Sequence, residues 1–329
     1  PHLSIAGMTT TTQLRYDPEF DAATAQMRAS MANMPKTELH DIETRRQRVL
    51  GIFGMVNSQL PEVPHVTVTE HKLKSFDGVE ISVHQFRKQE NTTTGSALLH
   101  IHGGGMIAGS AMMLDRLLAQ NVSTTGVQIF SIEYRLAPEV TGTVLVQDCY
   151  ATLLWLHENA SQFGVDKARI GLHGESAGGG IAAGVALMAR DKKLSPPLAK
   201  QILIYPMIDD KNVHSIPSMA DKVIWTHEDN ITGWTALLGD KIGTDQVSPY
   251  CAPIRAADLS GLPSTYMDVG GLDLFVEEDA LYAERLVAAN VEVEFHLFPG
   301  VPHSWQTFSP DIAITKMAVA ARLRAMMSF

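Results

Sequence analysis

The chain has 329 residues, of which 45% are hydrophobic and 19% charged, an ordinary balance for a globular protein with a sizeable core. Its formal net charge of -10 argues against a general nucleic-acid binder, because such proteins need a basic face. Two cysteines are too few for a disulfide framework, and no apolar run approaches the length of a membrane span. The first seven residues lack the features of a signal peptide, so we expect a cytoplasmic protein, whether monomer or homodimer.

The N-terminal part of the chain predicts helices. From residue 9 to residue 60, apolar residues recur three and four positions apart and glycines are few. Two interpretations stay open: these helices pack against the main domain, or they form a lid over a substrate pocket. We assign residues 1–60 to a helical segment that contributes to a cap.

Strands begin after this segment. Residues 66–74 and 80–87 alternate between apolar and polar side chains, and Asp77-Gly78 marks a turn between them, which predicts an antiparallel hairpin. Strands and helices then alternate, with strands predicted at 96–102, 127–134, 168–173, 201–206, 265–270 and 291–298, and helices at 114–122, 144–159, 177–190, 280–289 and 312–327. This alternation predicts an α/β fold with a mostly parallel central sheet that is covered by helices on both faces.

One segment breaks the alternation. Residues 207–250 contain Trp225, Trp234 and two prolines, but no clear strand. We interpret this segment as an insertion that joins the N-terminal helices in a cap. The α/β core is then divided into a first part at 61–206 and a second part at 251–329.

A candidate nucleophile lies in the third of these predicted strand-to-helix turns. Residues 174–178 read Gly-Glu-Ser-Ala-Gly and fit the G-x-S-x-G pattern, with a predicted strand before them and a helix after them. The glycines leave room for neighbouring backbone, so the Ser176 hydroxyl can project from the turn. The start of the helix favours developing negative charge. Taken alone, the motif also fits a glycine-rich turn with an incidental serine.

A glycine run supplies candidate oxyanion donors. Residues 102–105 read His-Gly-Gly-Gly and follow a predicted strand, 74 positions before Ser176. An ester carbonyl gains negative charge on its oxygen when it is attacked, and backbone N–H groups that are already in place stabilise that charge. Glycines let the backbone approach closely, and the N–H of Ala177 is expected to add a donor. If this run were only a flexible loop, its position before the Ser176 turn, in the order that the catalytic arrangement requires, would be a coincidence.

A serine needs an imidazole to take its proton and a carboxylate to orient that imidazole. In the strand-turn-helix setting of Ser176, the acid precedes the histidine along the chain. Asp273 follows the predicted strand that ends near residue 270, and His303 lies in the loop after the last predicted strand. Asp268 is a weaker candidate for the acid because it lies inside its strand.

The remaining ionisable residues near these positions receive other interpretations. Glu277 and Asp279 lie at the start of a predicted helix and are interpreted as capping or solvated charges. His296 is interpreted as a packed or half-exposed histidine within its strand. His100 and His102 are two positions apart, but no further ligands complete a zinc pattern, so no metal is expected.

In these motifs the chain resembles the hormone-sensitive-lipase-like esterases, also called bacterial family IV lipolytic enzymes. The resemblance spans most of the chain from about residue 65. Residues 102–105 look like the family's HGGG motif, whose second and third glycines supply oxyanion donors, which implies that role for Gly104 and Gly105. Asp273 and His303 fall where the family's acid and base lie. Two more segments, Tyr134 to Glu139 and Gly174 to Gly179, are similar to its structural segment after a buried strand and to its elbow.

The resemblance implies an α/β-hydrolase fold with a helical cap. It also implies hydrolysis of short- to medium-chain acyl esters through Ser176, His303 and Asp273, with a covalent acyl-enzyme and no cofactor. Lactones, amides and acyl transfer stay open, because all pass through the same tetrahedral intermediate. A non-catalytic small-molecule receptor on the same fold is the alternative from another class. A nucleotide-binding fold is less favoured, because no G-x-G-x-x-G follows the first parallel strand.

The chain departs from the family pattern at four places. Met106 stands where an aromatic residue is common, and we expect it to reshape the pocket. Glu175 stands where aspartate is frequent, and Leu274 stands where proline is usual. Residues 140–143 replace a proline-bearing stretch. These departures leave substrate preference open, because none of them removes a predicted catalytic group.

Overall fold

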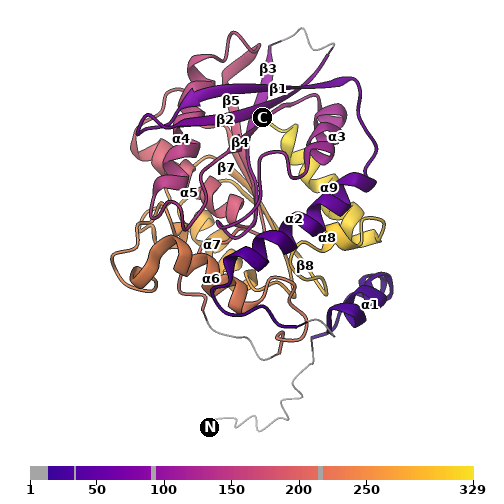
Figure 1. The fold of residues 1–329 in the computed structure, drawn as a ribbon. Coiled ribbons are helices and arrows are strands. Elements are labelled where there is room, and N and C mark those ends of the chain that lie inside the picture. The colour runs from indigo at the N-terminus through magenta and orange to yellow at the C-terminus, as the bar shows by residue number, and fades with distance from the viewer. Residues whose placement is uncertain (1–13, 33–34, 90–93, 214–217) are drawn as a thin grey trace, which may run out of the picture.

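The computed structural model describes residues 14–329 apart from 33–34, 90–93 and 214–217. Within these residues, eight strands form one sheet in the order β1-β2-β4-β3-β5-β6-β7-β8 (Figure 1). Strand β2 is antiparallel to β1 and β4, and all other neighbours are parallel, which confirms the predicted α/β class. The strands are β1 (Val66–Lys74), β2 (Glu80–Lys88), β3 (Gly95–Ile101), β4 (Gln128–Glu133), β5 (Val165–Glu175), β6 (Lys200–Ile204), β7 (Ser264–Gly270) and β8 (Val293–Phe298).

Helices cover both faces of this sheet. Helices α3 and α9 lie on one face, and α4, α5 and α7 lie on the other (Figure 1). The α-helices of the described residues are α1 (Pro18–Ala32), α2 (Ile42–Gln59), α3 (Asp115–Thr125), α4 (Val144–Glu158), α5 (Ala177–Asp191), α6 (His227–Leu238), α7 (Val276–Ala288), α8 (Trp305–Phe308) and α9 (Ala313–Met326), with two 3₁₀ turns, η1 (Gly239–Lys241) and η2 (Pro253–Arg255).

The central strands are apolar because both of their faces are buried. Leu98 and Leu99 are neighbours in β3 and both are fully buried, yet they belong to different hydrophobic clusters. Successive side chains of a strand point to opposite faces, so each leucine packs under a different helical layer. A strand that is covered on both sides reads as an apolar run without alternation, as the sequence shows here.

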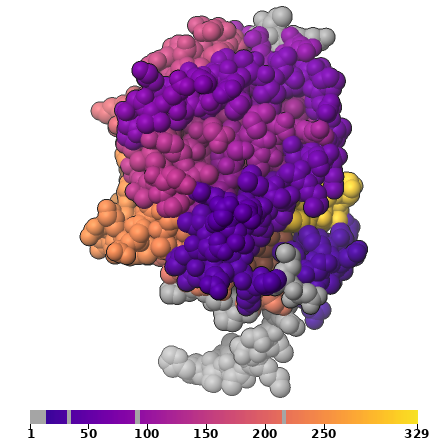
Figure 2. All heavy atoms as spheres, in the orientation of Figure 1, coloured from indigo at the N-terminus to yellow at the C-terminus, as the bar shows by residue number. Residues whose placement is uncertain are grey.

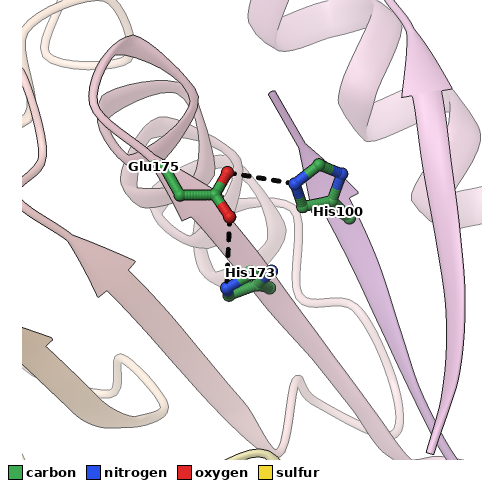
Figure 3. Close-up of side chains that lie close together, drawn as sticks. All are labelled: His100, His173 and Glu175. Carbon is green, nitrogen blue, oxygen red and sulfur yellow. Dashed lines mark hydrogen bonds and ion pairs between the residues drawn. The ribbon is translucent and has the colours of Figure 1, made fainter. Parts of the chain in front are cut away.

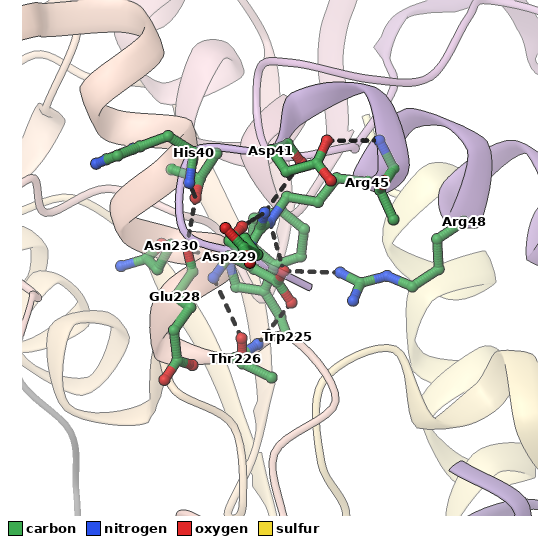
Figure 4. Close-up of polar contacts among 12 residues, drawn as sticks. His40, Asp41, Arg45, Arg48, Trp225, Thr226, Glu228, Asp229 and Asn230 are labelled. Carbon is green, nitrogen blue, oxygen red and sulfur yellow. Dashed lines mark hydrogen bonds and ion pairs between the residues drawn. The ribbon is translucent and has the colours of Figure 1, made fainter. Parts of the chain in front are cut away.

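Helix α2 and helix α6 lie side by side, although they are far apart in the sequence. Figure 2 shows α2, in indigo, across the lower part of this face, between the orange segment that follows α6 and the yellow C-terminal residues. Arg45 of α2 donates a hydrogen bond to Asp229 of α6 at 2.8 Å, and both side chains are only 1% exposed (Figure 4). Parts of the two predicted cap segments, residues 1–13, 33–34 and 214–217, lie outside the described residues.

The arginine that follows Arg45 ties α2 to the core. Arg46 donates to the carbonyl oxygens of Ile107 and Ala137, and it forms a bidentate pair with Glu139. Glu139 is 59% exposed, so this pair lies at the surface, in contrast to the buried pair of Arg45. Helix α2 is thus fixed by polar contacts on two sides. Among the described helices, none is both long and apolar enough to cross a membrane.

Candidate active site

Ser176 lies at the junction of β5 and α5, in a strained backbone conformation. Its φ of 58° and ψ of -124° lie in a region that few residues other than glycine adopt. The flanking glycines are required by close backbone contacts. A Cβ at Gly174 would lie 2.3 Å from the carbonyl oxygen of Gly178, and one at Gly178 would lie 2.0 Å from that of Ile101. The tight turn places the hydroxyl at the carboxyl end of the sheet.

The structure brings Ser176, His303 and Asp273 together from three separate loops. His303 Nε2 lies 3.0 Å from the Ser176 Oγ, and His303 Nδ1 lies 2.7 Å from Oδ2 of Asp273. A carboxylate only accepts hydrogen bonds, so Nδ1 carries the ring proton and Nε2 presents a lone pair to the serine hydroxyl. This is the tautomer that a general base needs.

The surroundings of His303 fix the orientation of its ring. The rings of Tyr205 and Phe275 contact it edge to face, with centroid distances of 4.5 and 5.2 Å. Asp273 is fully buried, and its second oxygen accepts a hydrogen bond from the Phe275 N–H at 3.0 Å. Tyr205 was missed at the sequence level. The signal that could have found it is its position directly after β6, the strand between those that carry Ser176 and Asp273.

The glycine run lies beside the nucleophile. A Cβ at Gly103 would lie 3.3 Å from the Cβ of Ser176. Gly104 and Gly105 have φ values of 119° and 63°, and in the described part of the chain neither of their N–H groups donates to a protein acceptor. Ala177 is the first residue of α5, where a backbone N–H has no partner inside the helix. The predicted oxyanion donors are therefore next to Ser176 and free to bind a ligand.

A cavity of about 640 Å³ opens at Ser176 and His303. Trp225, from the segment at 207–250, closes it over the glycine run, because a Cβ at Gly105 would lie 2.3 Å from the Trp225 ring. Helices α2, α3 and α9 supply apolar walls, which include Ile52, Phe53, Val56, Leu117, Leu323 and Met326.

Met106 does not have the effect that its position predicted. It is 2% exposed, packs in the main core cluster and lies outside the residues that line the cavity. Its φ of 67° turns the chain immediately after the triple glycine, which carries the side chain into the core. The expectation that Met106 reshapes the pocket is therefore wrong.

The other acidic residues near the site lie in different surroundings. Asp268 forms a buried bidentate pair with Arg322 of α9, at 2.7 and 2.8 Å, and accepts a hydrogen bond from Tyr266. Asp279 is fully buried, and among the described residues neither of its carboxylate oxygens has a hydrogen-bond partner. Burial raises its pKa well above the usual range, which favours a neutral carboxyl group. The expectation of a capping or solvated charge is therefore wrong for Asp279, whereas Glu277 is exposed.

Comparisons with known proteins identify the family of the chain. A family model for the α/β-hydrolase fold matches residues 98–307. The carboxylesterase NlhH of Mycobacterium tuberculosis is 31% identical over 270 residues, which cover 81% of this chain and 84% of NlhH. The carboxylic ester hydrolase LipN of the same species is 32% identical over 246 residues, which are 73% of this chain and 65% of LipN.

A solved structure extends the match to nearly the whole chain. A bacterial heroin esterase is 34% identical, with a TM-score of 0.86, and the match covers 95% of this chain and 97% of that one. The residues that the family model matches include the elbow, the glycine run and the loop of His303. The chain therefore belongs to the α/β-hydrolase fold family, in the hormone-sensitive-lipase-like group that its motifs resemble.

Proposed function

We propose that the chain is a serine carboxylic ester hydrolase that cleaves short- to medium-chain acyl esters through a covalent acyl-enzyme on Ser176. The observation that carries this proposal is the position of His303, within hydrogen-bond distance of both Ser176 and Asp273. A serine hydroxyl is a weak nucleophile until a base takes its proton, and this arrangement supplies that base. The relatives named above are esterases, which supports an ester as the substrate.

In the first half-reaction, Ser176 Oγ attacks the ester carbonyl carbon as His303 Nε2 takes its proton. The carbonyl oxygen becomes an oxyanion, which accepts hydrogen bonds from the N–H groups of Gly104, Gly105 and Ala177. One such donor is worth about 3 kcal/mol of barrier. The imidazolium then gives its proton to the leaving alcohol oxygen, the C–O bond breaks, and the acyl group stays on Ser176.

In the second half-reaction, a water molecule attacks the acyl-enzyme. His303 Nε2 takes a proton from this water, and the same oxyanion donors stabilise the second tetrahedral intermediate. Collapse of the intermediate breaks the bond to Ser176 Oγ, which takes the proton back, and the carboxylic acid is released. Asp273 holds the imidazole in one tautomer and stabilises its charged form in both halves.

The walls of the cavity support the choice of acyl group. We propose that α1, α2 and the described part of residues 207–250 form a cap over the core, because α2 is bound to α6 and Trp225 contacts the glycine run. The cavity has a volume in the range of drug-sized ligand sites and apolar walls from three helices. A cavity of this limited volume suits a short or medium apolar chain better than a long one.

A panel of p-nitrophenyl esters, from acetate to palmitate, tests this proposal. We expect kcat/KM to be highest for chains of roughly two to ten carbons and to fall about tenfold or more for palmitate, because the cavity has a limited volume. A lactone and an anilide in the same panel measure the preference for esters. A profile that rises to palmitate contradicts the chain-length proposal. Failure to hydrolyse any member, with a small molecule still bound, favours a receptor.

A further inference from the structure

Three ionisable side chains meet beneath the nucleophile. His100 of β3 is paired with His173 of β5 in the sheet register, and Glu175 lies two positions further along β5, on the same face as His173 (Figure 3). His100 Nε2 lies 3.0 Å from Oε2 of Glu175, and His173 Nε2 lies 3.5 Å from Oε1. Each histidine is only 3% exposed, Glu175 is 21% exposed, and all three line the cavity at Ser176.

The proton on one nitrogen of His100 follows from its neighbours. Ser131 Oγ lies 2.8 Å from the carbonyl oxygen of Ala111 and 2.8 Å from Nδ1 of His100. A carbonyl only accepts, so the single hydroxyl proton of Ser131 is donated to Ala111. The remaining contact needs a donor on the imidazole, so Nδ1 of His100 carries a proton.

The contact between Nε2 of His100 and Glu175 needs a proton as well. With Glu175 ionised, an unprotonated Nε2 would present a lone pair to a carboxylate oxygen 3.0 Å away, and two acceptors at that distance repel, so a proton lies between the two atoms. A second proton on Nε2 converts this contact into a charge-assisted hydrogen bond. Burial by itself raises the pKa of Glu175, but the charge and hydrogen bond of His100 help to outweigh it and lower that pKa to about 2.

The Glu175 side chain leads directly to the strained residue of the elbow. Ser176 keeps its positive φ only if its surroundings hold it there. Strand β6 and the residues after it hold the elbow on one side, through the hydrogen bonds from Ser176 N–H to Ile204 and from Met207 N–H to Ser176. On the other side, the contact with His100 ties the residue before Ser176 to strand β3.

The proposed oxyanion donors lie in the loop that follows strand β3. Gly103 follows His100 by three residues, and a Cβ added there would lie 3.0 Å from the carbonyl oxygen of Glu175. We propose that His100 is a positioning residue whose imidazolium binds Glu175 and so holds the nucleophile elbow against the strand of the oxyanion glycines. This inference rests on the proposed esterase function, because it assigns His100 a role in that reaction.

His173 provides a matched control in the same cluster. Its burial equals that of His100, but its contact with Glu175 is longer, at 3.5 Å, and its Nδ1 has no hydrogen-bond partner. Burial lowers the pKa of His173 to about 4, so its ring is neutral near pH 7. Replacing His100 by phenylalanine removes the shorter contact with Glu175, and replacing His173 by phenylalanine removes the longer one, while the other histidine stays in place.

Steady-state kinetics separate the two histidines. We expect H100F to lower kcat about 10- to 100-fold with KM changed less than about threefold, because a shift of about 1 Å at a reacting group costs up to about 10²-fold. H173F should stay within about threefold of the wild type. E175Q should retain more activity than E175A, because a glutamine amide can donate to Nε2 of a neutral His100 and keep the bond.

Nitrogen NMR of protein labelled with ¹⁵N-histidine tests the proton itself, without any substrate. In the wild type at pH 7 we expect protons on both ring nitrogens of His100, whose signals are identified by their loss in H100F. In E175Q the Nε2 proton should be absent. An unprotonated Nε2 in the wild type overturns the proposal. So does one equivalent of bound Zn²⁺ that shifts these signals, since these ligand atoms lie within 4.8 Å of one another and a metal would then replace the proton.

The kinetic measurements distinguish failure of the positioning role of His100 from failure of the proposed esterase function. If the wild type hydrolyses esters and H100F matches its kcat, the positioning role of His100 is wrong and the esterase function stands. If the wild type hydrolyses no ester, the proposed function fails and the positioning role falls with it, whatever the NMR spectrum shows. Thermal unfolding of each variant shows whether a loss of activity comes from a loss of fold.

Discussion

Replacing Ser176 by alanine is expected to lower kcat for a short-chain ester by about 10⁶-fold, the order found when a triad nucleophile is removed. The alanine has no Oγ to form the acyl-enzyme, so neither half-reaction can proceed through His303. Rate enhancement by the oxyanion donors and by substrate binding remains, and it leaves a residual activity above that of water. Hydrolysis of p-nitrophenyl butyrate, followed by release of p-nitrophenol, measures the change.

Ser309→Ala is the control for this substitution. Ser309 is also buried, at 3% exposure against 7% for Ser176, and its hydroxyl donates to the carbonyl oxygen of Trp305 outside the cavity. We expect this variant to keep its kcat within about twofold, because a hydrogen bond of this kind contributes only about 1 kcal/mol to stability. If S176A retained wild-type kcat, another residue would have to be the nucleophile.

Replacing Asp229 by alanine is expected to lower the free energy of unfolding by about 3–5 kcal/mol, because it leaves a buried guanidinium without its counter-charge. Asp229 accepts hydrogen bonds from Arg45 and pairs with Arg48, both from α2 (Figure 4). It also closes the capping box of α6 with Thr226, so the variant loses a helix cap as well. Unfolding in urea measures the effect.

Glu139→Ala is the matched control for the buried pair. Glu139 pairs with Arg46 of the same helix through two hydrogen bonds, but it is 59% exposed. Exposed pairs contribute about 0–1 kcal/mol, so E139A should be destabilised far less than D229A. Equal losses in the two variants would show that burial of Arg45 and Asp229 does not determine the contribution of this contact.

The fold class was predictable because each strand and helix has a recognisable local sequence pattern. The turn at Asp77-Gly78 indicated the β1–β2 hairpin, and apolar runs such as 96–102 indicated strands with two buried faces. The order of the strands was not predictable in this way. Strand β4 lies between β2 and β3, and a pattern within one segment contains no information about which other segment it pairs with.

The positions of Ser176, Asp273 and His303 were predictable for a different reason. Each directly follows a predicted strand, and the carboxyl ends of parallel strands meet at one edge of the sheet. The contacts between Glu175 and His100, and between Arg45 and Asp229, were not found. They join residues 75 and 184 positions apart, and only the packed fold brings such pairs together. The burial of Asp279 was not predicted either, because its position near the start of a helix suggested a solvated charge.

Covalent labelling tests most directly whether Ser176 is the nucleophile that His303 activates. A p-nitrophenyl phosphonate reacts with an activated serine and stays bound to its Oγ, so peptide mass spectrometry after treatment identifies the residue directly. We expect one adduct per chain, on the peptide that contains Ser176, with loss of esterase activity in step with labelling. An adduct on a different residue, or full loss of activity while Ser176 remains unmodified, would contradict it.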